Sequence, residues 1–151
     1  MPVGNFMFTP QSSGGIITDW VVYTPTFTGF GTVSAVGFYS RRVGQTLEVR
    51  GNFGSGVSTA TAAKMTVGFN GTSANVTIDT TNVASTACGV FAVGATGQFP
   101  SMILYPASND TTVSFGKSSA TTNPVAAANA DTIAGTGQSV QIFFTVKIVG
   151  W

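Results

Sequence analysis

The sequence predicts an all-β domain, an antiparallel β-sandwich or jelly roll, and three observations support this prediction. Apolar and polar residues alternate with a period of two in several short segments, as in strands with one buried face. Glycine, proline and asparagine separate these segments at the spacing of about 8–12 residues that sandwiches and barrels show. No segment of the 151 residues keeps a period of 3.6, so we expect little helix.

The chain is expected to consist of an N-terminal arm, residues 1–19, and a jelly-roll domain, residues 20–151. Prolines and glycines in the arm disfavour regular structure. The arm also holds an apolar run, Phe6, Met7 and Phe8, in a segment too short to fold by itself. This run either packs back on the domain or inserts into a partner.

The domain is expected to begin with strands. Residues 20–30 are rich in Thr, Val, Tyr and Phe but are interrupted by Pro25 and Gly29, which suits an edge strand with a break. Residues 33–42 continue with β-branched and aromatic side chains. Gly44 can adopt a positive φ, which predicts a tight turn.

Residues 46–53 and 64–69 show the clearest alternation in the first half of the domain. Their spacing predicts two half-buried strands. An Asn70-Gly71 turn follows the second of them. The expected inward side chains are Leu47, Val49, Gly51, Phe53, Met65, Val67 and Phe69.

Further strands are expected in the second half, over residues 76–78, 89–96, 99–105, 111–115 and 138–149. In the last and longest of these, one face holds Val140, Ile142, Phe144, Val146 and Ile148. The opposite face includes Phe143 and is only partly polar. A strand with apolar residues on both faces indicates contacts on both, and the second contact could be a neighbouring subunit.

Residues 118–137 form a tract of Ser, Thr, Ala, Asn and Gly without obvious strands. A short helix over residues 125–130 is expected, because this Ala-rich stretch follows Pro124. Loops of this length in compact domains are usually functional or covered by a partner.

The charge content is unusual, with 7% charged residues against about 25% in a typical soluble domain. Such a surface costs little to desolvate, which favours a symmetric assembly over the alternative of a neutral, Thr-rich monomer. The net charge of +1 is spread along the chain, so we expect neither nucleic acid nor a membrane as partner. The start of the chain lacks the features of a secretory signal, so folding in a cytoplasm is expected.

The residues needed for common catalytic and metal chemistry are scarce. There is no histidine, the five acidic residues form no close pair in the sequence, and Cys88 is the single cysteine. General bases, metal cages and disulfides therefore lack their usual residues. We expect no enzymatic activity, no cofactor and no metal.

Among the polar residues, the pair Arg41 and Arg42 most clearly suggests a specific contact. Neighbouring residues in a strand face opposite sides, so one of them can face a partner or Glu48 while the other meets solvent. A solvated strand end is the plainer interpretation. Together with Phe143, the two arginines are our candidates for contact with a neighbouring subunit or partner.

Two segments, WVVYTPTFTG at residues 20–29 and RRVGQTLEVRG at residues 41–51, resemble a module of tailed-bacteriophage virion proteins. That module occurs in tail-fibre tips and in capsid-surface proteins, and residues 133–137, IAGTG, are similar to its ending. The resemblance implies a trimeric jelly roll, like the complement and tumour-necrosis-factor head domains, without an active site. Gln45 departs from the pattern, because that turn position is often acidic in relatives.

The short arm and the trimeric domain together suggest a capsid decoration (cement) protein. Phe6, Met7 and Phe8 would anchor the arm to the major capsid protein, and the protein would be located on the virion after assembly in the host cytoplasm. The alternative is a tail-fibre tip or adaptor that binds host-surface glycans. In that case Tyr39, Tyr105 or residues 118–137 would contact the sugar.

Overall fold

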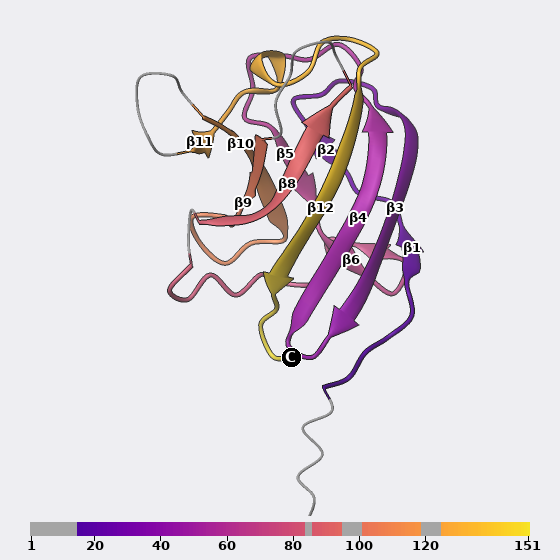
Figure 1. Ribbon diagram of the computed structural model, residues 1–151, viewed down its shortest axis with the longest axis vertical. Coiled ribbons are helices and arrows are strands. Elements are labelled where there is room, and N and C mark those ends of the chain that lie inside the picture. The colour runs from indigo at the N-terminus through magenta and orange to yellow at the C-terminus, as the bar shows by residue number, and fades with distance from the viewer. Residues whose placement is uncertain (1–14, 84–85, 95–100, 119–124) are drawn as a thin grey trace, which may run out of the picture.

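The computed structural model contains one antiparallel sheet that curls strongly into an open half-barrel (Figure 1). It describes residues 15–83, 86–94, 101–118 and 125–151. The predicted all-β antiparallel class is confirmed, and these ranges contain no α-helix. The arm residues Phe6, Met7 and Phe8 lie outside the described residues.

Most of the strands are short, and the three longest are β3, β4 and β12. In chain order the strands are β1 (Val21–Tyr23), β2 (Phe27–Thr28), β3 (Ser34–Val43), β4 (Thr46–Gly54), β5 (Lys64–Thr66), β6 (Gly68–Phe69), β7 (Thr72–Ser73), β8 (Ala87–Val93), β9 (Ser101–Leu104), β10 (Thr112–Lys117), β11 (Ala126–Ala127) and β12 (Ser139–Lys147).

The strand order across the sheet is β1-β3-β4-β12-β8-β9-β10-β5-β2, and β11 pairs with β10. The hairpin β6-β7 stands apart as a two-stranded sheet. The last strand, β12, therefore lies between β4 and β8, far from either edge, and joins the early strands to the later ones.

The alternation predicted for β4 and β12 is confirmed. Leu47, Val49 and Phe53 are fully buried in β4, and the five predicted inward residues of β12 and its extension are buried. In β4, Gly51 also faces inward, and Phe38 of β3 covers it. Because each strand buries one face only, the other face of the same strands is left on the outside of the half-barrel.

Aromatic rings fill the inside of the curl and connect its two sides. The Phe53 ring of β4 lies 4.2 Å from that of Phe27 in β2, centroid to centroid, and 5.1 Å from that of Phe30. Phe115 of β10 lies 5.0 Å from Phe30 and 5.1 Å from Phe91. In Figure 1, β3, β4 and β12 accordingly lie in front of β2 and β5.

Several predicted turns are present with the expected backbone. Gly44 has a φ of 60° in the turn between β3 and β4. Asn70 and Gly71 have φ values of 57° and 79° between β6 and β7, as a tight hairpin turn requires. Residues 15–19 run beside β3, where the Gly44 amide donates a hydrogen bond of 2.7 Å to the Ile16 carbonyl oxygen.

Four predicted elements differ from the structure. The strand expected over residues 64–69 is divided into β5 of the half-barrel and β6 of the separate hairpin. Residues 125–130 form no helix, because the backbone of β11 pairs with Gly116 and Lys117 instead; a single 3-10 turn follows at Ala130–Thr132. The tract 118–137 therefore contains a short strand. Residues 76–78 do not form a strand, although Ile78 makes one isolated bridge with Ile148.

Candidate interaction surface

The convex outer face of the half-barrel carries a row of side chains that crosses five strands. Strand register places Val22 of β1 beside Tyr39 of β3, and Tyr39 beside Arg50 of β4. Arg50 lies beside Phe143 of β12, and Phe143 beside Val90 of β8. We call these five residues the outer row.

Four of the five side chains in the outer row are apolar or aromatic and remain open to solvent. Their exposed fractions are 57% for Val22, 42% for Tyr39, 49% for Phe143 and 45% for Val90. Single exposed apolar residues are common on protein surfaces, whereas a contiguous row is typical of a contact surface. Burial against another protein would remove this apolar area from water.

The charges near the outer row are engaged within the chain. The Arg41 Nε donates to Glu48 Oε2 at 2.7 Å, and its guanidinium lies 4.6 Å from the ring centroid of Trp20. The Arg50 guanidinium lies on the same ring at 4.2 Å and at 5.8 Å from the Tyr39 ring. Trp20 thus holds two cations by cation–π attraction; Glu48 balances the charge of Arg41, whereas the exposed Arg50 keeps its charge on this face.

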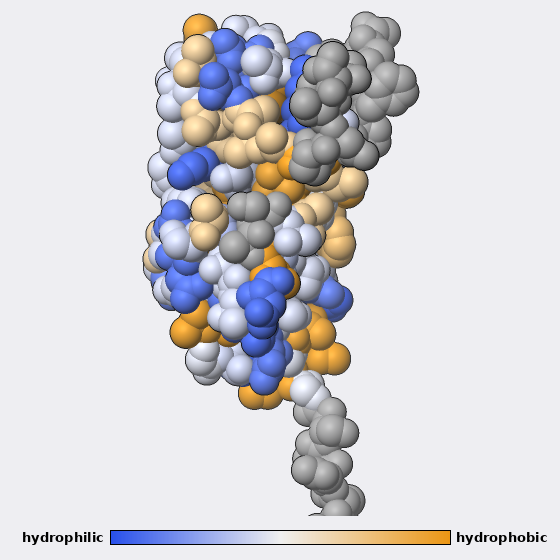
Figure 2. All heavy atoms as spheres, turned by 90° about the vertical axis from the view of Figure 1, so that its left-hand side faces the viewer, coloured by the Kyte–Doolittle hydropathy of each residue, from blue (hydrophilic) through white to orange (hydrophobic). Residues whose placement is uncertain are grey.

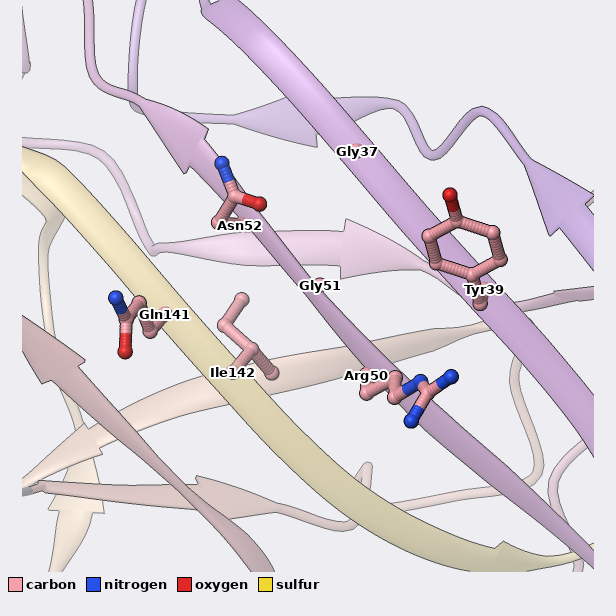
Figure 3. Close-up of a pocket in the computed structure, with 7 residues that line it drawn as sticks. All are labelled: Gly37, Tyr39, Arg50, Gly51, Asn52, Gln141 and Ile142. Atoms are coloured by element: carbon pink, nitrogen blue, oxygen red, sulfur yellow. The ribbon is translucent and has the colours of Figure 1, made fainter. Parts of the chain in front are cut away.

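A shallow hollow of about 460 Å³ lies next to the outer row, over β3, β4 and β12 (Figure 3). It exists because Gly37 has no side chain at a position where the neighbouring strand presents Asn52. The amides of Asn52 and Gln141 lie on one side of it, and Tyr39 and Arg50 lie on the other (Figure 3). The Asn52 Nδ2 donates to the Ala35 carbonyl oxygen at 3.1 Å, so its Oδ1 can accept a further bond.

The lower end of the molecule in Figure 1 holds the β3-β4 turn and the C-terminal residues. Arg42 stacks on Trp151 at 4.6 Å here, and its Nε donates to the Gly44 carbonyl oxygen at 2.8 Å. Apolar atoms reach the surface at this end in Figure 2. Ile16 and Ile17 pair with Gly44 and Val43 beside the β3-β4 turn, Val149 follows β12, and all three are exposed. Residue 15, the first described residue, contacts Gly44 at the same end.

Two partly buried nucleophilic groups are held in their neutral forms. Burial raises the pKa of the Cys88 thiol to about 12, and its Sγ donates to the Ile103 carbonyl oxygen at 3.4 Å. Burial also raises the pKa of Tyr105, whose hydroxyl donates to the Thr145 carbonyl oxygen at 3.5 Å. A thiol with a raised pKa forms little thiolate, so Cys88 is a packing residue rather than a nucleophile.

Within residues 15–83, 86–94, 101–118 and 125–151, no group of three or more His, Cys, Asp or Glu side chains lies close enough to hold a metal ion. No helix in those ranges has the length and apolar character needed to cross a membrane.

The three described candidate contact residues occupy two different places. Phe143 and Arg41 lie on the outer face, and Arg41 makes the Glu48 contact that the sequence offered as one option. Arg42 lies at the lower end against Trp151. Sequence reasoning missed Val22, Val90 and the Gly37 hollow, because only the strand order brings them beside Phe143 and Tyr39.

Comparison with known proteins gives no relative. No protein-family model, no curated protein and no solved structure matches the chain.

Proposed function

We propose that this chain is a non-enzymatic structural protein of a bacteriophage virion. It forms a homotrimer that decorates the capsid, and its N-terminal arm binds the major capsid protein and stabilises the shell. The outer row carries this proposal, because four of its five side chains are apolar or aromatic and exposed, and the fifth, Arg50, stacks on Trp20. The virion is its location, after assembly in the host cytoplasm.

The low charge content favours an oligomeric assembly over a monomer. Only 7% of residues are charged, and the charges of the outer face are stacked or paired within the chain. Joining two such faces removes few hydrated ions from water, so the hydrophobic gain is not cancelled by desolvation.

The segments that resemble the phage module support the type of assembly. Residues 20–29 contain β1 and β2, residues 41–51 contain the β3-β4 turn and most of β4, and residues 133–137 precede β12. They therefore include Val22 and Arg50 of the outer row. The jelly-roll architecture and the three-fold symmetry are what the resemblance implies for this surface.

The lower end supports attachment to a shell. Ile16, Ile17 and Val149 are exposed there, close to the point where residues 1–14 join the domain. Phe6, Met7 and Phe8 of the arm would then insert into the shell. Burial of large apolar side chains stabilises by about 1.5–3 kcal/mol each, and three arms acting together multiply the effect.

Deletion of residues 2–14 tests the attachment. We expect the shortened protein to keep its oligomeric mass and melting temperature, because β1 and the Ile16–Gly44 contact remain. Binding to purified capsid shells should fall to background in a co-sedimentation assay. Unchanged binding would contradict the proposed role of the arm.

The hollow beside Tyr39 favours a second candidate function, a tail-fibre tip or adaptor that binds host-surface glycans. Aromatic rings and amides are the groups that stack on and hydrogen-bond to sugars, and Tyr39, Asn52 and Gln141 offer both. Tyr105 is the weaker candidate, because its hydroxyl is bound to the Thr145 carbonyl oxygen.

A glycan array separates the two functions. Sugar binding by the wild type that is lost in Tyr39→Ala, together with a label that marks the tail in imaged virions, would support the tail role. A label over the capsid and no glycan binding would support decoration.

A further inference from the structure

We propose that Asn70-Gly71, at the tip of the β6-β7 hairpin, is a site of spontaneous deamidation whose rate is set by how often the hairpin opens. The modification requires water and no enzyme, so it does not depend on the proposed function. Asn70 is the only asparagine in the sequence that a glycine follows.

The reaction is an attack of a backbone nitrogen on a side-chain carbon. The Gly71 nitrogen gives its proton to solvent and bonds to Cγ of Asn70, the Cγ–Nδ2 bond breaks, and ammonia leaves. Water then opens the cyclic imide. Cleavage between the nitrogen and Cγ gives aspartate, whereas cleavage between the nitrogen and the main-chain carbonyl carbon gives isoaspartate. Glycine favours the attack, because it has no Cβ to hinder the close approach of its nitrogen.

Both reacting groups are accessible in the structure. Asn70 and Gly71 are exposed, and a Cβ placed on Gly71 would meet nothing closer than the Val22 carbonyl oxygen at 3.7 Å. Within the part of the chain that the structure describes, neither the Asn70 side chain nor the Gly71 N–H makes a hydrogen bond. Neither group therefore has to break a hydrogen bond before it reacts.

Two other asparagines show the contrast. The Asn75 Oδ1 accepts a hydrogen bond of 2.9 Å from the Phe69 N–H, and its Nδ2 donates one of 2.8 Å to the Phe69 carbonyl oxygen. The Asn109 Oδ1 accepts from the Thr80 N–H at 3.1 Å and from the Thr80 hydroxyl at 2.8 Å. The residue after each of them also has a side chain, which hinders the same attack.

The hairpin turn restrains the reaction at Asn70. Ring closure requires the peptide group between Asn70 and Gly71 to rotate until its nitrogen faces the Asn70 side chain, and a tight turn limits this rotation. The hairpin itself is short, because β6 and β7 pair through two residues each and belong to no larger sheet. A hairpin of this size is marginally stable by itself, so its contacts with neighbouring residues set how often it opens.

The Asn75 side chain is the contact that most directly opposes opening. It holds both backbone groups of Phe69, the residue immediately before Asn70. Asn75 is exposed, so its removal takes no side chain out of the core. A second contact joins the two strands of the hairpin to β5, where the Ser73 and Thr66 hydroxyl oxygens lie 2.6 Å apart.

Conversion would affect the lower end of the molecule through Phe69. The Phe69 ring lies 5.0 Å from that of Trp151, centroid to centroid, and Arg42 stacks on the other contact surface of Trp151 at that end. Isoaspartate adds a methylene to the main chain of a two-residue turn, so Phe69 and Thr72 would lose their pairing. Both products also add one negative charge to a chain whose net charge is +1.

Peptide mapping by mass spectrometry tests the inference. The wild type is incubated at mildly alkaline pH beside two variants that favour opening, Asn75→Ala and Ser73→Ala, and labelling by protein isoaspartate methyltransferase detects isoaspartate. Asn129→Ala is the matched control, because Asn129 is exposed and its side chain does not cap the 3-10 turn that follows it. Circular dichroism verifies that the variants fold.

We expect Asn70 to lose its amide faster than any other described asparagine of the wild type. Asn75→Ala should raise the rate at Asn70 about fivefold or more, because two hydrogen bonds that oppose opening are lost, and Ser73→Ala should raise it less. The control should match the wild type. An Asn70 that keeps its amide, or a rate that is the same in the wild type and in both opening variants, would overturn the inference.

Discussion

At the scale of single residues, stacking between arginine and tryptophan shapes the surface. All three arginines lie on one of the two tryptophans: Arg41 and Arg50 on Trp20, and Arg42 on Trp151. The rings hold the guanidinium groups against the sheet and shield part of their charge. The few charged groups of this chain are therefore less accessible to a partner.

Replacing Trp20 should destabilise the fold through this stacking. We expect Trp20→Ala to lower the free energy of unfolding by about 1–3 kcal/mol, since two cation–π contacts and a half-buried ring are lost. Urea denaturation at fixed protein concentration measures it. Trp20→Phe keeps a ring face and should lose less, whereas equal losses in both variants would contradict the stacking argument.

Two glycines on neighbouring strands should respond differently to a methyl group. A Cβ at Gly51 would lie 2.5 Å from ring carbons of Phe38, so Gly51→Ala should cost about 1–3 kcal/mol of unfolding free energy. A Cβ at Gly37 meets only Asn52 Oδ1, so Gly37→Ala should stay within about 0.5 kcal/mol of the wild type. Thermal melts of the two alanine variants measure their stabilities, and equal losses in both would contradict this prediction.

At the scale of elements, alternation within one segment was predictable and pairing between segments was not. The period of two predicted which side chains of the segments 46–53 and 138–149 face inward. Turn chemistry predicted the turns at Gly44 and Asn70-Gly71. Short pieces such as β11 have no pattern of their own; β11 pairs with Gly116 and Lys117, where β10 extends past its pairing with β5. The site was only partly predictable for the same reason. The alternation in residues 138–149 singled out Phe143, but only the strand order shows that Val90 and Arg50 lie beside it.

The segment that contains Asp79 is tied to the end of β12 by an ion pair. Asp79 Oδ2 lies 2.9 Å from Lys147 Nζ, and bonds from Lys147 and Thr81 lower the pKa of Asp79 to about 2. Since the unfolded value is about 3.8, the ionised form stabilises the fold above that pH. This stability should be lost as the pH falls from about 4 to about 2.

Asp79→Asn should therefore remove part of the acid sensitivity. We expect the wild-type melting temperature to fall more steeply than that of the variant between about pH 4 and pH 2, where Asp79 takes up its proton. Above pH 5 the two curves should run parallel. Identical slopes through the acid range would show that the pair does not contribute.

The aromatic core links elements that are distant in the sheet. Phe53 of β4 contacts Phe27, Phe30 and Phe115 across the inside of the curl. Phe53→Ala should cost about 3–5 kcal/mol of unfolding free energy. The ring connects opposite walls of the half-barrel, and the cavity left by its removal would not close, because the two walls cannot both move into it. Phe53→Leu should cost less in the same urea titration, and a loss below 1 kcal/mol for the alanine variant would argue against a rigid core.

At the scale of the whole molecule, the outer face and the core are two sides of one sheet. The same strands that bury Phe53 and Phe144 inward present Arg50 and Phe143 outward. Core stability and assembly are therefore coupled through the strands. A change that shifts the register of β12 by one residue would exchange its two faces.

The oligomer should be insensitive to salt. Its proposed contact is apolar, and the nearby charges are engaged within the chain, so screening removes little attraction. We expect the trimer mass from light scattering to stay the same between low salt and about 1 M sodium chloride. Dissociation at high salt would indicate an interface held by ion pairs between subunits instead.

The central place of β12 also orders the events of synthesis. During translation, β1, β3 and β4 leave the ribosome long before residues 139–147, yet β4 and β8 meet only through that strand. Until it emerges, the two groups of strands expose edges and half-buried aromatic rings to a crowded cell. Folding of this sheet therefore ends only after its last strand is made, and nascent chains close to one another on a polysome must be kept apart until then.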